Sequence, residues 1–163
     1  MGVRSYTAEF ESPVAPSRLF NASVLHLHEI ASKIEMPTLV KGGVVIVEGD
    51  GGVGTIKEYH FPPVYGDSKP VRERVEELDK ENFMCKCSVV EGGTKGIGYK
   101  SASNKVSFEA TANGGSVCKL VGEFEELEGL EYTEEELSKR KEGKLATYKA
   151  VDAYLQANPS DYA

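Results

Sequence analysis

A glycine-rich stretch between two runs of β-branched residues constrains the fold of this chain most. Residues 48–57 read EGDGGVGTIK, so Gly49, Gly51, Gly52 and Gly54 fall within six positions. The residues on both sides, 43–47 and 55–61, are of the types that favour strands. Because glycine tolerates positive φ angles, the stretch predicts a loop that joins two antiparallel strands.

The same spacing partly matches two phosphate-binding motifs. Gly49 and Gly54 have the separation of the P-loop glycines, and residues 49–54 fit the dinucleotide pattern G-x-G-x-x-G. However, Thr55 follows where the P-loop needs lysine, which arrives only at Lys57. Both motifs also need a helix directly after the loop, and a strand is predicted there. We therefore expect a structural loop, and leave open a weak anion nest formed by its amides.

Composition is ordinary for a globular protein. The 163 residues suffice for one hydrophobic core, so we expect a single domain over 1–163 and a monomer. A net charge of −7 argues against general binding to nucleic acid or anionic membranes, which attract basic surfaces. We recognise no apolar run of about 20 residues and no signal peptide, and expect a cytoplasmic protein.

The chain has three cysteines, an odd number that is compatible with reduced thiols in the cytoplasm. Cys85 and Cys87 are two positions apart in a strand-like run, which puts both side chains on one face. Neighbouring same-face positions on one strand give poor disulfide geometry. A zinc site would need more ligands than Cys118 and three scattered histidines offer. We therefore predict buried free thiols, no metal and no cofactor.

The first part of the chain predicts a strand followed by two short helices. Residues 3–10 alternate as in a strand, and two prolines interrupt the pattern at 13 and 16. Apolar residues at helical spacing follow from 17 to about 34. Pro37 ends this pattern, and a break between the two helices is expected near 26–29.

The rest predicts six strands and a long helix. From 41 to about 127, turn signals separate strand-like runs at the glycine loop and at 62–67, 79–82, 92–93 and 113–115. Thr133 and Glu136 then form a capping box before a helix that runs to about 156. The order predicts an α+β fold, in which a curved seven-stranded antiparallel sheet wraps around the C-terminal helix.

A curved sheet and a straight helix can leave a cavity between them. Gly143, in the middle of the helix, would make room there at a cost of about 0.5–1 kcal/mol relative to alanine. If Tyr59 and Phe61 point inward, strand alternation turns Lys57 inward as well. Hydroxyl groups reach candidate apolar surfaces at Tyr6, Tyr99, Ser116 and Tyr148. This mixture predicts a small-molecule site, with an ordinary core as the alternative.

Several segments together resemble one plant family. The loop 48–57 resembles the hallmark of the plant pathogenesis-related class ten proteins, typified by the birch major pollen allergen. The resemblance extends to residues 1–3, 15–20, 82–83, 88–93, 113–116 and 150–155, and so spans the whole chain. It implies a helix-grip fold with a large cavity that binds flavonoids, cytokinins, sterol-like hormones and other phenolics, in connection with defence.

By position, the resemblance places ligand-binding residues at Tyr6, Lys57, Tyr59, Phe61, Arg74, Cys85, Cys87, Ser116, Lys141 and Gly143. We add Tyr99 and Tyr148 to this set. Cys85 and Cys87 occupy positions where many relatives carry tyrosines. Gly143 occupies a position where relatives often carry a larger residue. Both differences imply a wider cavity, with ligands that are bulkier or depend less on phenolic hydrogen bonds.

The resemblance also raises three activities. Ribonuclease activity has been attributed to the family at positions that fall on Lys100, Asp152 and Tyr154, but lysine replaces an acid there. Abscisic-acid receptors share the fold, but residues 63–70 replace their Ser-Gly-Leu-Pro-Ala gate, which argues against phosphatase inhibition.

Alkaloid-forming enzymes such as norcoclaurine synthase use a cavity lysine, a role that Lys57 or Lys119 could take. His26, His28 and His60 are dispersed, and no pair for acid–base work is evident. We expect a binding and storage protein with no catalytic residues, and keep a weak ribonuclease or an enzyme of specialised metabolism as alternatives.

Overall fold

The computed structural model describes residues 2–62, 69–93, 95–96 and 98–163. One antiparallel sheet has the strand order β1-β7-β6-β5-β4-β3-β2, which confirms the predicted seven-stranded meander. The strands are β1 (Val3–Ser12), β2 (Val44–Glu48), β3 (Ile56–Tyr59), β4 (Val71–Asp79), β5 (Met84–Glu91), β6 (Ser101–Ala110) and β7 (Ser116–Glu125). The first strand therefore pairs with the last, and β2 forms the opposite edge.

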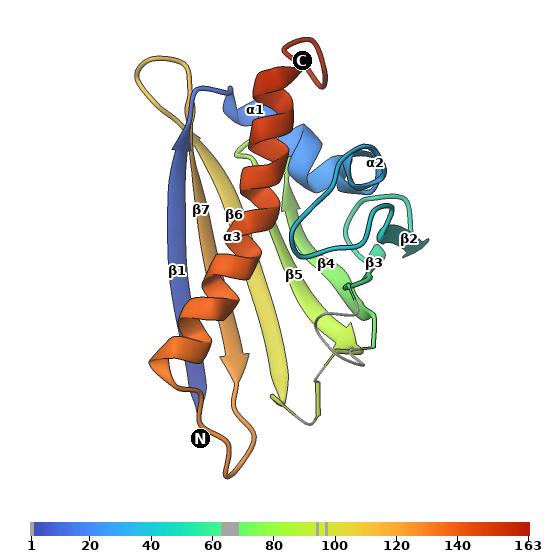
Figure 1. Cartoon of the computed structure of the whole chain (residues 1–163), viewed down its shortest axis with the longest axis vertical. Helices are drawn as coiled ribbons and strands as arrows, with labels where there is room; N and C mark the ends of the chain where they lie inside the picture. Colours follow the sequence, from blue (N-terminus) through green and yellow to red (C-terminus); the bar gives the residue numbers. More distant parts are fainter. Residues whose placement is uncertain (1, 63–68, 94, 97) are drawn as a thin grey trace.

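The short helices follow β1 as predicted. They are α1 (Pro16–Phe20), the π-helical segment η1 (Asn21–Leu25) and α2 (Leu27–Lys33). The backbone leaves helical geometry at His26, with φ −128° and ψ 23°, and this is the expected break. Figure 1 shows α1 and α2 at one end of the sheet. Of the helices in the described ranges, none is long and apolar enough to cross a membrane.

The long helix α3 (Glu134–Ala157) crosses the sheet along its length (Figure 1). Its first turn has the predicted capping box: the Glu136 amide donates to Thr133 Oγ1 at 3.1 Å, and the Thr133 amide donates to Glu136 Oε2 at 2.8 Å. At the other end, Arg18 donates from Nε to the Asp161 carbonyl at 2.7 Å. It also donates to the carbonyl of Leu155 at 2.9 Å. Both ends of α3 are therefore fixed.

The hydrophobic core lies under the C-terminal half of α3. Val151 and Leu155 are fully buried there against Leu19 and Phe20 of α1 and Phe108 of β6. A second, smaller cluster packs Leu137, near the start of α3, against Tyr99 and Phe124. Between these clusters, residues 138–144 are polar or glycine, so the middle of α3 cannot fill the space above the sheet with large apolar side chains.

The glycine loop uses its own amides. Gly49, Gly51 and Gly54 have φ angles of 96°, 100° and 92°, which glycine alone adopts freely. The Gly51 amide donates to Thr55 Oγ1 at 2.8 Å, the Gly52 amide to Asp50 Oδ1 at 3.0 Å, and the Gly54 amide to the Val75 carbonyl at 2.8 Å. Strand β3 follows, as predicted. The loop is a strand connection in which the amides of Gly51, Gly52 and Gly54 already have partners within the protein, and no helix follows it as a phosphate loop requires.

Candidate functional site

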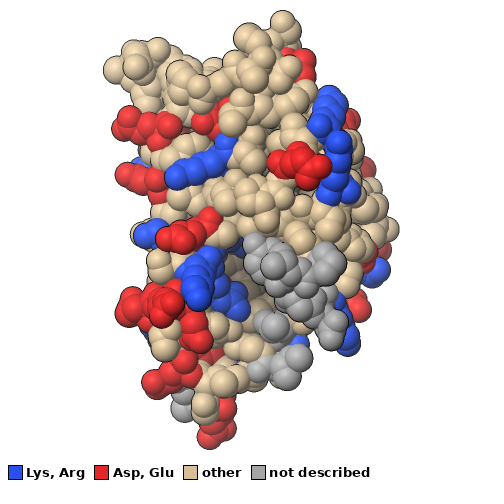
Figure 2. Space-filling view, viewed as in Figure 1, with Lys and Arg blue, Asp and Glu red and all other residues tan. Residues whose placement is uncertain are grey.

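A cavity of about 480 Å³ lies between the sheet and the middle of α3. Apolar wall residues come from the short helices and the strands, and include Val24, Leu39, Val71, Val89, Val106 and Phe124. Figure 2 shows that this face of the molecule is hollowed beside the lower half of α3, with Lys and Arg side chains at the edge. Lys139, Arg140 and Lys144 of α3 supply cations to the lining.

Strand alternation turns a consistent set of side chains into this space. Tyr6 of β1, Lys57 and Tyr59 of β3, and Cys85 and Cys87 of β5 all face the cavity. The strands pair in register, so Glu73 lies opposite Lys57 and Asn104 lies opposite Cys87. Polar and sulfur-containing groups from five strands are therefore gathered on one concave surface.

The polar centre of the cavity is an ion pair between Glu73 and Lys144. Lys144 Nζ lies 3.3 Å from Glu73 Oε2, and the side-chain Nδ2 of Asn104 donates to Glu73 Oε1 at 3.1 Å. The Glu73 side chain is only 7% exposed. Burial alone would lower the pKa of Lys144, but attraction to Glu73 and Tyr6 outweighs it, and the pKa ends above its ordinary value. The cavity therefore holds one ammonium and one carboxylate in contact.

Lys57 forms a second cationic point, 6% exposed, with Nζ donating to the Val24 carbonyl at 2.7 Å. Four tyrosines surround the two charged points: Tyr6, Tyr59, Tyr99 and Tyr148. Burial raises the pKa of each of them, and that of Tyr59 and Tyr148 most. Their hydroxyl groups stay neutral and can both donate and accept hydrogen bonds.

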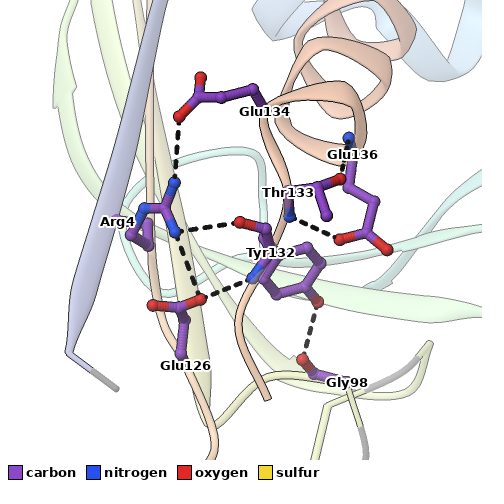
Figure 3. Close-up of polar contacts among 7 residues, drawn as sticks. All are labelled: Arg4, Gly98, Glu126, Tyr132, Thr133, Glu134 and Glu136. Carbon is purple, nitrogen blue, oxygen red and sulfur yellow. Dashed lines mark hydrogen bonds and ion pairs between the residues drawn. The ribbon is translucent and has the colours of Figure 1, made fainter.

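One side of the cavity is bounded by Arg140, whose guanidinium carbon lies 5.2 Å, 5.1 Å and 4.8 Å from the ring centres of Tyr99, Phe124 and Tyr132. Tyr132 is in turn anchored on both sides. Its hydroxyl donates to the Gly98 carbonyl at 2.7 Å and its backbone amide donates to Glu126 Oε2 at 2.8 Å (Figure 3). Arg4 contacts the Tyr132 carbonyl at 3.1 Å. Arg140 is therefore held in place by stacking on three aromatic rings, and one of these residues, Tyr132, is itself fixed by hydrogen bonds.

Most of the residues expected at the site line this cavity: Tyr6, Lys57, Tyr59, Phe61, Cys85, Cys87, Tyr99, Gly143 and Tyr148. Their contact with a ligand stays a prediction. The three cysteines are free thiols, as predicted, although Cys87 is half-buried. At Gly143, an added Cβ atom would meet nothing closer than Thr38 Cγ2 at 4.0 Å, so this position does leave open space.

Three expected residues do not line the cavity. Arg74 points to the outer face, where its Nε donates to Glu76 at 2.9 Å, because Glu73 and Val75 take the inward positions of β4. Ser116 is fully buried and donates to the Val14 carbonyl at the end of the sheet. Lys141 is exposed on the side of α3 that faces away from the cavity. The positions carried over from the family are wrong for these side chains.

Sequence reasoning missed Glu73, Asn104, Arg140 and Lys144. The signal was present for Glu73, because it alternates with Val71 and Val75 on what reads as the inner face of one strand. A carboxylate in the apolar phase of a strand indicates a buried partner. Lys144 carries no such signal, because the helical stripe through Leu137, Tyr148 and Leu155 passes close to both Lys141 and Lys144 and does not choose between them.

The positions considered for ribonuclease chemistry do not come together. Lys100 precedes β6 and is 66% exposed beside Glu125, whereas Asp152 is buried and bonded to Ser12 at the far end of the sheet. The nine residue steps of β6 between these ends correspond to about 30 Å. Tyr154 donates to Asp161 instead. For the receptor-type gate, residues 63–68 lie outside the described part of the chain.

Comparisons with known proteins agree with this architecture. The family model described as Pathogenesis-related protein Bet v 1 family matches residues 1–158. The chain is 41% identical to the Probable intracellular pathogenesis-related protein T1 of Catharanthus roseus, over 99% of this chain and 100% of the relative. It is 36% identical to the Major pollen allergen Aln g 1 of Alnus glutinosa, over 99% of each.

Solved structures show the same fold. The crystal structure of Ara h 8.0201 superposes with a TM-score of 0.81 at 26% identity, covering 96% of this chain and 100% of that one. Norcoclaurine synthase from Thalictrum flavum, in complex with dopamine and hydroxybenzaldehyde, gives a TM-score of 0.69 at 21% identity, covering 95% and 87%. The second similarity concerns the fold alone.

Proposed function

The chain belongs to the Pathogenesis-related protein Bet v 1 family, and from that premise we propose that it binds and stores hydrophobic small molecules in the cavity under α3. The observation that carries the proposal is the cavity of about 480 Å³, with a largely apolar wall around the Glu73–Lys144 pair. Small-molecule sites have this size, from about 300 to 1,000 Å³, and this mixture of apolar wall and few polar points.

We propose plant flavonoids, cytokinins, sterol-like hormones and other phenolics as the ligand class. Glu73 can accept a hydrogen bond from a ligand hydroxyl, and Asn104 and Lys144 can donate to a ligand carbonyl. Cys85, Cys87 and Gly143 occupy little volume on the wall, which favours bulky ring systems. A flat, mostly apolar molecule with one or two oxygen atoms satisfies both requirements.

A binding panel tests this proposal. Displacement of an apolar fluorescent dye by flavonoids, sterols and cytokinins should give affinities of about micromolar or tighter for some of them. Mass spectrometry of small molecules released from protein purified from its native tissue would then name the occupant. If neither the dye nor any member of the panel binds, the proposal is wrong.

A pair of variants separates cavity binding from surface binding. Gly143→Phe places a ring in the open space beside Thr38, and should weaken binding of the larger ligands at least tenfold, or about 1.4 kcal/mol. Glu142→Phe puts the same ring on the neighbouring exposed position, and binding should be unchanged. Equal effects of the two variants would mean that the ligands bind outside the cavity.

An enzyme of specialised metabolism is the second candidate, because carboxylate and ammonium groups share the cavity. Glu73, Lys57 and Lys144 are of the types that transfer protons to bound substrates. Incubation with phenolic aldehydes and amines, followed by product analysis, separates the two candidates. A product that disappears in Glu73→Gln favours an enzyme, whereas recovery of unchanged ligand favours storage.

We further propose a cytoplasmic monomer that takes part in defence and has no general affinity for nucleic acid or membranes. The similarity to the Probable intracellular pathogenesis-related protein T1 of Catharanthus roseus supports this setting. Light scattering of the purified protein measures its mass in solution. Protein abundance in tissue before and after exposure to a pathogen tests the connection with defence.

A further inference from the structure

Two thiols lie side by side in the cavity wall. Cys85 Sγ and Cys87 Sγ are 3.7 Å apart, and both residues line the cavity. They occupy successive inward positions of β5, so the backbone of the sheet fixes their spacing. The third thiol, Cys118, is fully buried in the core cluster and does not line the cavity. Cys85 and Cys87 are therefore a candidate reactive site, and the buried thiol of Cys118 serves as an internal control.

The surroundings of the pair favour a thiolate on Cys85. The hydrogen bond with Cys87 lowers the pKa of Cys85 most. Burial and the negative charge of Glu73 oppose this, whereas the positive charge of Lys57 adds to it. The same hydrogen bond, followed by burial, raises the pKa of Cys87, so Cys87 holds its proton more firmly than Cys85 does. One sulfur atom is prepared as a nucleophile and its neighbour stabilises the charge.

We propose that the Cys85–Cys87 pair is a covalent attachment site for α,β-unsaturated carbonyl compounds that enter the cavity, with Cys85 as the nucleophile. This inference rests on the proposed function, because an electrophile reaches these sulfur atoms only as a cavity ligand. Many apolar ring compounds carry a conjugated enone, so the ligand class and the reactive group are compatible. The protein then holds such ligands through a covalent bond, in addition to the non-covalent binding proposed above.

The addition needs no further reactant. The Cys85 thiolate forms a carbon–sulfur bond to the β-carbon of the enone, and the electron pair of the carbon–carbon double bond moves to give an enolate. The nearby positive charge of Lys57 stabilises the enolate oxygen. The proton that Cys85 gave up ends on the α-carbon, which restores the carbonyl group. The product is a thioether, and nothing is oxidised or reduced overall.

Cys118 supplies the expected contrast in reactivity. Burial raises the pKa of its thiol to about 12, with the charge of Asp152 adding to the shift. Because each pKa unit changes the thiolate fraction tenfold, Cys118 carries on the order of a thousandth of the thiolate of an ordinary cysteine at neutral pH. It is also inaccessible to a cavity ligand. We therefore expect selective reaction at Cys85.

The experiment compares chalcone, an apolar enone, with dihydrochalcone, which lacks the reactive double bond. Reduced protein is incubated with each compound at neutral pH and measured by intact-protein mass spectrometry. Chalcone should add the mass of one molecule, and dihydrochalcone should bind only reversibly. Trypsin separates the three thiols, because cleavage after lysine puts Cys85 in 81–86, Cys87 in 87–95 and Cys118 in 106–119.

Three variants complete the test, each first checked for folding by circular dichroism. Cys85→Ser should slow adduct formation at least about tenfold, because the hydroxyl is not ionised. Cys87→Ser keeps a weaker donor and should give an intermediate rate, whereas Cys118→Ser should react as the unmodified protein does. Wild-type rates in Cys85→Ser, or equal labelling of 106–119, would overturn the proposal.

The two compounds also distinguish failure of this inference from failure of the proposed binding function on which it rests. Dihydrochalcone binding without any chalcone adduct would overturn covalent attachment and leave reversible binding supported. Absence of both dihydrochalcone binding and the adduct, in a protein that also fails to bind the apolar dye, would overturn the proposed function together with the inference.

Discussion

The ring of Tyr6 on β1 lies directly over Gly122 on β7, in the space that a side chain would occupy. A Cβ atom built at Gly122 would come within 2.2 Å of Tyr6 Cζ and 2.5 Å of its hydroxyl oxygen. The two residues are paired in the strand register, so the backbone holds them together. Gly122 therefore determines how far the Tyr6 ring reaches across the sheet into the cavity.

Gly122→Ala should displace this ring and reduce stability by about 1–2 kcal/mol, within the range for overpacked sites. In a Tyr6→Ala background the clash is gone, and the same change should be neutral or stabilising, because alanine is less costly than glycine in a strand. Urea denaturation of the four proteins measures both effects. A loss of similar size in both backgrounds would mean that the backbone, and not the ring, requires glycine.

The Glu73–Lys144 pair should respond unequally to loss of either partner. Lys144→Met leaves the carboxylate of Glu73 buried, with a side chain 7% exposed, and should cost about 2–4 kcal/mol. Glu73→Gln leaves an ammonium on a side chain that is 42% exposed and can be hydrated, so the cost should be near 1 kcal/mol.

Lys141→Met is the matched control on the exposed side of the same helix, and should change stability by less than about 0.5 kcal/mol. Denaturation curves of the three variants are directly comparable. Equal losses of stability for Lys144→Met and Glu73→Gln would contradict the view that the loss depends on how deeply the unpaired charge is buried.

The fold could be predicted because local signals agree with one another. The capping box at Thr133, the Asn-Gly-Gly turn and the glycine loop each fix one boundary, and alternation between them gives the strands. The same alternation would have placed Arg74 on the outer face, because Val71 and Val75 flank Glu73 in the inward phase. That error arose from carrying over a family position instead of following the strand.

The helical side of the site was less predictable. Residues 138–144 have no apolar stripe, so periodicity cannot decide whether Lys141 or Lys144 faces the sheet. The rotation of α3 depends on contacts between residues far apart in the sequence, including the packed clusters at its two ends. Ser116 does face inward, but the turn after β1 covers it, which strand alternation cannot reveal.

Alkaline pH should destabilise the protein through its cavity tyrosines. Burial raises the pKa of Tyr59 and Tyr148 well above the ordinary value of 10.0, so the folded state keeps protons that the unfolded state loses. Their contribution to stability is complete below pH 10 and is lost as the pH rises from there towards the folded-state values.

Tyr148→Phe removes one such proton and should make the decline above pH 10 less steep, by up to about 1.4 kcal/mol per pH unit. Denaturation at a series of pH values measures the slope. Ultraviolet absorbance should show the tyrosinate signal of these residues appearing together with loss of secondary structure. An unchanged slope in Tyr148→Phe would show that this hydroxyl ionises equally in both states.

Arg18 joins α1 to the C-terminal end of α3, and its removal should loosen both. The last turn of α3 contains no basic residue, so Arg18 is the cation that meets its terminal carbonyl groups, through bonds to Leu155 and to the C-cap residue Asn158. A further bond reaches the carbonyl of Asp161, beyond the helix. Arg18→Gln should cost about 1–2 kcal/mol. Arg18→Lys keeps the charge but loses the planar fork that reaches several carbonyl groups, and should recover only part of that loss.

Hydrogen exchange distinguishes this role from a general surface effect. Amides near 155–161 should exchange faster in Arg18→Gln, while those around the capping box at Thr133 and Glu136 should keep their protection. Arg74→Gln, which breaks an exposed pair with Glu76 on the outer face, is the matched control and should leave both regions unchanged. Full recovery of stability in Arg18→Lys would show that a positive charge alone stabilises the end of the helix. Uniform loss of amide protection along α3 would show that its two ends are not held independently.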